Sequence, residues 1–124
     1  MRVLVCGSRD WIDRKLIEKT LLDFHFSEMK SFEDGGKIDT IISGEAQGAD
    51  LLAKGIAHHH KFKYIGFPAL WNQYGKRAGY VRNQQMLDEG NPDIVFAFWD
   101  GQSRGTKMMI DLAKKAGVPV KVIQ

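Results

Sequence analysis

Apolar and polar residues are arranged along the chain in two kinds of segment. Short β-branched apolar runs predict buried strands, and longer stretches with apolar residues three or four positions apart predict helices. The two kinds of segment follow one another through all 124 residues. The expected strands are Val3–Cys6, Thr40–Ile42, Lys63–Phe67, Asp93–Trp99 and Val118–Ile123. The expected helices are Ile12–Phe26, Gln47–His60, Lys76–Asp88 and Thr106–Ala116, with a polar surface loop over Ser27–Lys37.

This alternation predicts a single α/β domain over residues 1–124. A repeated strand–helix pattern is typical of a parallel sheet with helices on both faces, and this length suits one core. Right-handed crossovers leave few topologies, so we expect a three-layer sandwich with about five strands in the order 3-2-1-4-5. The switch point of such a sheet lies between the first and fourth strands, where open α/β sheets bind ligands.

Four of the expected strands run directly into turns, and in a parallel sheet all these turns share one edge. The turns are Cys6–Trp11, Ser43–Asp50, Pro68–Trp71 and Trp99–Thr106. Together they are rich in Gly, Ser, Thr and Arg, which predicts a pocket for an anionic ligand, and a nucleotide suits such a pocket best.

The second turn reads Ser43-Gly44-x-Ala46-x-Gly48-Ala49-Asp50. Its glycines let the backbone approach a phosphate, and free amides at a helix N-terminus favour an anion. Asp50 would face a ribose hydroxyl or hold the loop. The alternative is a tight turn with Ser43 as a helix cap. The turn lacks the full Gly-x-Gly-x-x-Gly fingerprint and the Walker lysine, which argues against an ordinary dinucleotide dehydrogenase or P-loop ATPase.

The first and fourth turns carry further candidates for anion binding. The guanidinium group of Arg9, in Gly7-Ser8-Arg9, can form a bidentate hydrogen bond with a phosphate, or it can pair with a local carboxylate. Trp11 either covers a base or packs under the first helix. The fourth turn, Asp100-Gly101-x-Ser103-Arg104-Gly105-Thr106, either cradles a second phosphate through hydroxyl and amide groups or simply caps the next helix.

The third helix adds positive charge near the same edge. Arg82, next to Asn83, can reach back toward the pocket, whereas Lys76 and Arg77 fit either the pocket or a solvated surface. The formal net charge of +3 and the isoelectric point near 9.0 suit an anionic ligand but do not require nucleic acid.

Cysteine and histidine residues predict no metal site, and we expect no cofactor. Cys6 is the single cysteine, and we expect it to pack inside the first strand. One cysteine cannot form an intrachain disulfide, which suits a cytoplasmic protein. The apolar run at the N-terminus is too short for a signal peptide or a membrane span. His58-His59-His60 should be a frayed helix end, because consecutive helical residues point in different directions and no second cluster completes a site.

The motifs together resemble the SLOG superfamily, and most closely its small stand-alone YspA-like branch. The resemblance covers nearly the whole chain and implies a Rossmann-like fold that binds nucleotides or nucleotide-derived ligands. Relatives include the Lonely Guy phosphoribohydrolases, the SMF/DprA DNA-binding proteins and sensor domains for NAD-derived signals. The branch is often linked to phage and phage defence, which favours a signal-binding role. The motifs that carry it are Gly7-Ser8-Arg9-x-Trp11, Ser43-Gly44-x-Ala46-x-Gly48-Ala49-Asp50, Arg82-Asn83-x-x-Met86 and Trp99-Asp100-Gly101-x-Ser103-x-Gly105-Thr106.

One departure from the family pattern bears on catalysis. Lonely Guy enzymes carry Pro-Gly-Gly-x-Gly-Thr-x-x-Glu, whereas Met109 stands here in place of the glutamate. A methionine can neither donate a proton nor stabilise an oxocarbenium ion, and loss of a general acid costs about 10²–10⁴-fold in rate. Asp100 is the first candidate for a displaced carboxylate, with Asp10, Glu45 and Asp50 also open.

Three functions follow from these features. The first is binding of a nucleotide or ADP-ribose-like molecule, as a sensor or sequestering protein. The second is cleavage of a nucleotide N-glycosidic bond by a displaced carboxylate. The third is single-stranded nucleic-acid binding, with stacking on Trp11, Trp71, Tyr74 and Tyr80. We also expect a homo-oligomer, paired through the third helix with Tyr80, Val81 and Met86 as a candidate surface.

Overall fold

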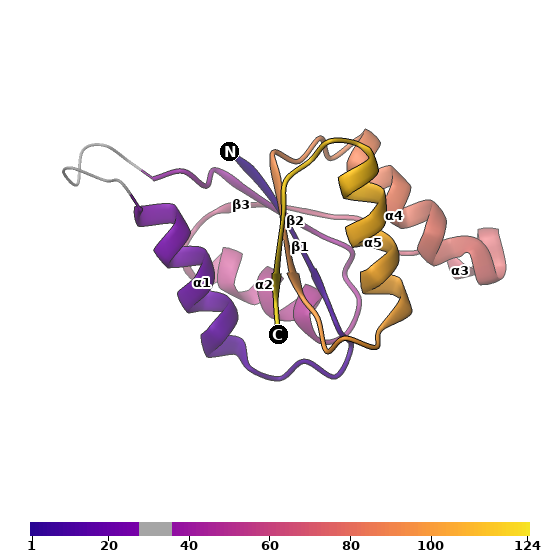
Figure 1. The fold of residues 1–124 in the computed structure, drawn as a ribbon, viewed down its shortest axis with the longest axis horizontal. Coiled ribbons are helices and arrows are strands. Elements are labelled where there is room, and N and C mark those ends of the chain that lie inside the picture. The colour runs from indigo at the N-terminus through magenta and orange to yellow at the C-terminus, as the bar shows by residue number, and fades with distance from the viewer. Residues whose placement is uncertain (28–35) are drawn as a thin grey trace.

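The computed structural model describes residues 1–27 and 36–124, and it contains a five-stranded parallel sheet (Figure 1). The strand order is β3-β2-β1-β4-β5, which confirms the predicted topology. The strands are β1 Arg2–Gly7, β2 Thr40–Ser43, β3 Lys63–Gly66, β4 Ile94–Phe98 and β5 Val120–Ile123. The helical segments are α1 Arg14–Phe26, α2 Ala49–His59, α3 Trp71–Tyr74, the 3₁₀ turn η2 Gly75–Arg77, α4 Ala78–Asp88 and α5 Arg104–Lys115. Most of the predicted loop Ser27–Lys37 lies outside the described residues.

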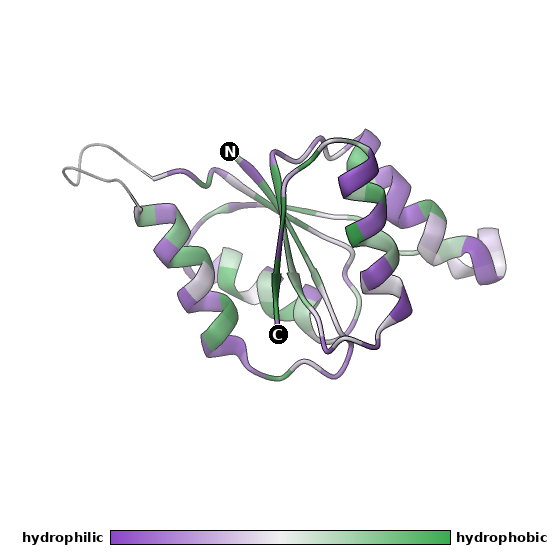
Figure 2. Cartoon of the chain, viewed as in Figure 1, coloured by the Kyte–Doolittle hydropathy of each residue, from purple (hydrophilic) through white to green (hydrophobic). Residues whose placement is uncertain are grey.

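Helices cover both faces of the sheet, with α1 and α2 on one side and α4 and α5 on the other (Figure 1). Side chains alternate along β1, so Val3 and Val5 join the core under α1 and α2, whereas Leu4 and Cys6 join the core under α4 and α5. Strands β1 and β4 are buried on both faces, which explains why they read as uninterrupted apolar runs. The apolar segments of Figure 2 accordingly gather along the sheet.

The central pair of strands sets the position of the switch point. Strand β1 pairs with β4 from Val3 opposite Ile94 to Gly7 opposite Phe98. The two strands therefore end side by side, and the amide of Ser8 continues the pairing by donating to the carbonyl of Phe98 at 3.0 Å. The turns after β1 and β4 start from one point at the carboxyl edge, as predicted for the switch point.

Helix starts differ from the predictions where a capping residue decides them. Helix α1 begins at Arg14 rather than Ile12, because the Asp13 carboxylate caps it by accepting from the amide of Leu16 at 3.0 Å. Ile12 therefore precedes the helix and is 89% exposed, so its inclusion in the predicted helix Ile12–Phe26 was wrong. The predicted helix Lys76–Asp88 is likewise divided into η2 and α4, with the short helix α3 before them.

The end of α2 also differs from the prediction. His60 is the cap residue, its ring meets that of His59 edge to face at 4.8 Å, and its Nε2 lies 2.8 Å from the Glu18 carboxylate. The prediction of a frayed end with diverging histidines was wrong for these two residues, because α1 packs against α2 and brings Glu18 to them.

The surface proposed for self-association needs a correction on α4. Met86 is only 1% exposed and packs in the core between the sheet, α4 and α5, so it cannot form part of an external surface. Tyr80 is exposed and Val81 is partly exposed. Self-association itself stays a prediction. Within the described parts of the chain, no helix combines the length and apolar character that crossing a membrane requires.

Candidate functional site

A cavity of about 520 Å³ lies at the carboxyl edge of the sheet, beside the ends of β1 and β4. This volume falls in the range of small-molecule sites. Its walls come from the turns after β1, β2 and β4, the first turns of α5, and the segment from α3 to α4. Ten predicted site residues line it: Gly7, Ser8, Arg9, Asp50, Arg82, Asn83, Asp100, Ser103, Gly105 and Thr106.

A second cavity of about 260 Å³ adjoins the first and is lined in part by the same residues. The shared residues are Arg9, Ala46, Trp71 and Arg82. Gly44 lines only the second cavity. The remaining predicted site residues, Ser43, Gly48 and Gly101, line neither of the two.

The turn after β2 is held by contacts within the protein. Gly48 has a φ of 84°, and a Cβ there would overlap the backbone oxygens of Ser8 and Arg9. The Ser43 hydroxyl donates to the carbonyl of Asp50 at 3.1 Å and lies 2.7 Å from the Tyr64 hydroxyl. These residues therefore shape the edge of the sheet from outside the cavities.

Arg82, which is partly buried, and Asp50, which is buried, lie on the cavity wall and interact through their charges. Arg82 Nη1 donates to the carbonyl of Gly44 at 2.6 Å, and Nε donates to the Asn83 side-chain oxygen at 2.9 Å. Asp50 Oδ2 accepts from the amide of Ala46 at 3.3 Å. Burial raises the pKa of Asp50 to about 6, against the opposing effects of the Arg82 charge and the turn amides. Burial also lowers the pKa of Arg82, against the Asp50 charge.

The turn after β4 is organised by Asp100. Its Oδ1 accepts from the amides of Gln102 and Ser103, both at 2.8 Å, and these bonds lower the pKa of Asp100. The amide of Asp100 in turn donates to the Ser8 hydroxyl at 3.0 Å, which joins the turns after β4 and β1. Asp100 is thus an ionised turn residue, which argues against its predicted role as a proton donor.

Helix α5 begins in the cavity wall. The Ser103 hydroxyl is its N-cap and accepts from the amide of Thr106 at 3.4 Å, as the capping alternative predicts. The next two amides, of Arg104 and Gly105, have no partner inside the helix because they belong to its first turn. A Cβ built on Gly105 meets no atom within 4 Å, so there is open space at this point.

Arg9 is an accessible cation in the site. Its side chain is exposed, lines both cavities, and makes no hydrogen bond or ion pair with any residue that the structure describes. The alternative of pairing with a local carboxylate is therefore not observed. Trp11, by contrast, packs edge to face on Phe98 at 5.6 Å and donates its indole N–H to the carbonyl of Asp13. Of the two alternatives for Trp11, packing against the core is therefore observed and a position over a base is not.

The cavity also has an apolar side that the motifs did not reveal. Met108 and Met109 of α5 line it, and Met109, at the position of the Lonely Guy glutamate, is 1% exposed. Helical spacing could have placed both side chains near the cavity, since Met108 lies three residues after Gly105 and Met109 three residues after Thr106, and residues three apart share a face. Cys6 also lines the cavity, and burial raises the pKa of its thiol, so the thiol is neutral and unreactive.

Comparison with known proteins identifies the family. The sequence model of the YspA, cpYpsA-related SLOG family matches residues 1–74, more than half of the chain. The chain belongs to this family. The chain is also similar to the Gene 61 protein of Mycobacterium phage D29, with 37% identity over 127 residues that cover 96% of this chain and 93% of the phage protein. No solved structure gave a significant match.

Family membership confirms the resemblance to the SLOG superfamily and indicates a function related to nucleotides. The family match spans β1 to α3, and therefore includes Arg9 and Asp50. Arg82 and the turn from Asp100 to Thr106 lie beyond it and within the longer match to the phage protein, which covers nearly the whole chain.

Proposed function

We propose that this protein binds a nucleotide-derived small molecule of the ADP-ribose type in the 520 Å³ cavity, as a sensor or sequestering protein. The observation that carries the proposal is the position of Arg9, a cation without a protein partner among the described residues, on the walls of both cavities at the switch point. Open α/β sheets bind ligands at this place, and the chain belongs to a SLOG family.

The phosphate-binding side of the proposed site combines Arg9 with the start of α5. The amides of Arg104 and Gly105, which have no partner inside the helix, and the positive end of the helix dipole favour an anion. Lys76, which also lines the larger cavity and is exposed, adds a second cation. Arg82 contributes charge, but its Nε and Nη1 atoms already donate to protein groups, so we assign it mainly to shaping the wall.

The shape of the site favours an elongated ligand over a mononucleotide. The 260 Å³ cavity adjoins the larger one at Arg9 and Arg82, so a ligand with two ring systems would place its phosphates near these guanidinium groups. Met108, Met109 and Tyr80 supply an apolar surface for one ring in the larger cavity. Such a ligand matches ADP-ribose and molecules derived from NAD.

Calorimetry with ADP-ribose, NAD, cyclic ADP-ribose isomers, ADP and AMP tests this proposal. Arg9→Ala should weaken the best ligand at least about tenfold, since a charge-assisted hydrogen bond contributes about 1.5–3 kcal/mol. Arg77→Ala is the matched control, because Arg77 is also exposed and lines neither cavity. Equal binding by the Arg9 variant and the wild type would remove Arg9 from the site. Failure of every nucleotide to bind would refute the proposed function.

A second candidate function is N-glycosidase activity, and one observation favours Asp50 over Asp100 for it. Asp50 lines the cavity with a pKa near 6, which suits a general acid, whereas the lowered pKa of Asp100 does not. Mass spectrometry of nucleotide mixtures after incubation with the protein would detect free base. Release that is lost in Asp50→Asn would support the enzyme, and recovery of intact ligand would support the binder.

Single-stranded nucleic-acid binding is the weakest of the three candidate functions. Trp11, one of its four predicted stacking residues, packs against Phe98. Two results together would favour nucleic-acid binding over the proposed site. The affinity for an oligonucleotide would fall steeply with salt, and small nucleotides would not bind.

A further inference from the structure

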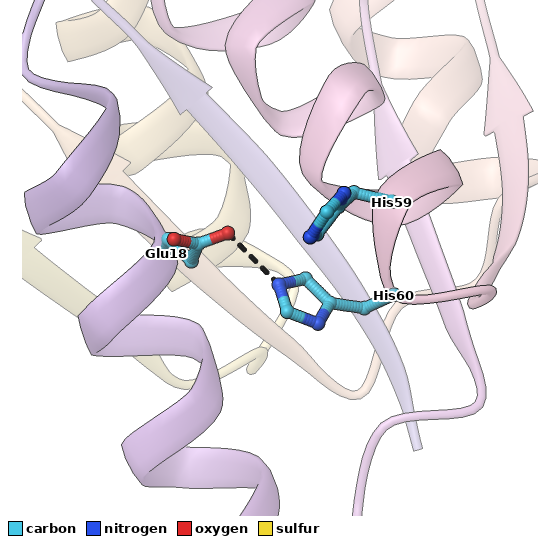
Figure 3. Close-up of side chains that lie close together, drawn as sticks. All are labelled: Glu18, His59 and His60. Atoms are coloured by element: carbon cyan, nitrogen blue, oxygen red, sulfur yellow. Dashed lines mark hydrogen bonds and ion pairs between the residues drawn. The ribbon is translucent and has the colours of Figure 1, made fainter.

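We propose that Glu18, His59 and His60 form a binding site for a divalent transition-metal ion, with Zn²⁺ as the best match. Each residue offers one ligand atom, and these atoms all lie within 4.8 Å of one another. Figure 3 shows both imidazole rings beside the Glu18 carboxylate. None of the three residues lines either cavity, so the site is separate from the proposed nucleotide site.

Two helices bring the three ligands together. Glu18 lies on α1, His59 is the last residue of α2, and His60 is the cap that follows it. His60 Nε2 lies 2.8 Å from Glu18 Oε2, the distance of a hydrogen bond, so these two atoms need to separate only slightly to bind one ion between them. The His59 ring meets the His60 ring edge to face at 4.8 Å between centroids.

Small side-chain rotations would complete a tetrahedral arrangement. Zinc–nitrogen and zinc–oxygen bonds of about 2.0–2.2 Å place neighbouring ligand atoms roughly 3.3–3.5 Å apart. Because the three ligand atoms already lie within 4.8 Å of one another, only small movements of the side chains are needed to reach that spacing. His59 is exposed, and Glu18 and His60 are about a quarter exposed, so an ion and a water ligand have access.

The ligand chemistry suits Zn²⁺ better than Mg²⁺ or Ca²⁺. Two imidazoles and one carboxylate form a borderline-soft donor set, whereas the hard cations require mainly oxygen ligands. Three protein ligands also leave a fourth position for water. Arg14 is the competitor for the site, since its Nη1 lies 3.4 Å from the same Glu18 oxygen, but this longer contact is partly exposed and weak.

His58 provides the internal control for this site. Its ring lies near Tyr64, with 5.8 Å between centroids, and it is not part of the three-residue cluster. A run of three histidines that chelated metal merely as a flexible segment would use His58 as readily as His59. A preformed site with Glu18 would use His59 and not His58.

The test is Zn²⁺ competition between the protein, free of any polyhistidine tag, and a chromophoric chelator. We expect one ion per chain, and we expect His59→Asn and Glu18→Gln each to weaken binding at least about tenfold, with His58→Asn within about twofold of wild type. Zn²⁺ should also raise the thermal midpoint of the wild type, because the ion bridges α1 and α2 in the folded chain only. Midpoints without metal check that each variant folds.

Three outcomes would overturn the proposal. One is no binding by the wild type at millimolar Zn²⁺. Another is an equal loss in His58→Asn and His59→Asn, which would indicate chelation by the histidine run alone. The third is unchanged affinity in Glu18→Gln, which would remove the ligand from α1.

Discussion

The buried carboxyl group of Asp50 provides a sharp test of the electrostatics of the cavity wall. Asp50 is 5% exposed, and burial raises its pKa from the ordinary value of 3.8 to about 6. Arg82, the turn amides and Arg9 favour the carboxylate but do not cancel the cost of burying its charge. The folded chain therefore binds a proton at Asp50 more tightly than the unfolded chain does.

The size and sign of the effect follow from this difference. A rise of about two pKa units corresponds to about 3 kcal/mol in the free energy of unfolding. Because the folded-state pKa lies above the unfolded value, this stability is fully present below about pH 4 and is lost as the pH rises through about 6. Asp50→Asn removes the titration and keeps an oxygen that can accept from the Ala46 amide. Relative to wild type, the variant should gain about 2.4 kcal/mol between pH 4 and pH 7, since the rest of the change lies below pH 4.

Urea denaturation of both proteins at intervals from pH 4 to pH 7 measures the gain. The comparison between variant and wild type removes the contribution of the other titrating groups. Asp111→Asn is the control for the loss of a carboxylate, because Asp111 is exposed on the surface of α5 and lies outside both cavities. A constant difference for Asp50→Asn would refute the reasoning, since it would mean that Asp50 ionises as easily in the folded chain as in the unfolded chain.

Further predictions concern positions where the backbone decides the effect. Gly105→Ala should raise the free energy of unfolding by about 0.5–1 kcal/mol, because Gly105 is helical and has open space beside it. In calorimetry the same variant should bind the nucleotide more weakly, because the added methyl group fills that space. Gly48→Ala should lower stability by more than about 1 kcal/mol in urea denaturation, because of its positive φ and its contact with Ser8, and an unchanged midpoint would contradict this. Asp13→Ala should cost about 1 kcal/mol through loss of the α1 cap, whereas Asp13→Ser should retain most of it.

Much of the fold could be predicted from local patterns. The uninterrupted apolar runs of β1 and β4 indicated strands buried on both faces, and the rule of right-handed crossovers then gave the observed strand order. The start of α1 could not be found in this way. Apolar periodicity includes Ile12, but the helix begins after Asp13, because the side chain of that residue satisfies a free amide of the first turn.

The candidate site was predicted in outline, because parallel strands bring their following turns to one edge. Arg9, Asp50, Asn83 and Thr106 line the cavity as expected. The role of Gly48 in the turn after β2 was not predictable, since its contact with Ser8 joins residues that are distant in the sequence.

By itself, the sequence determined the class of fold, the edge where the turns meet and the family of the protein. These features depend on periodicity, on handedness and on short motifs, all of which are local. Only the tertiary structure decided which turn residues face a cavity and which hold the backbone. It also decided that Glu18 meets His59 and His60, because helix packing brings together side chains that no local pattern connects.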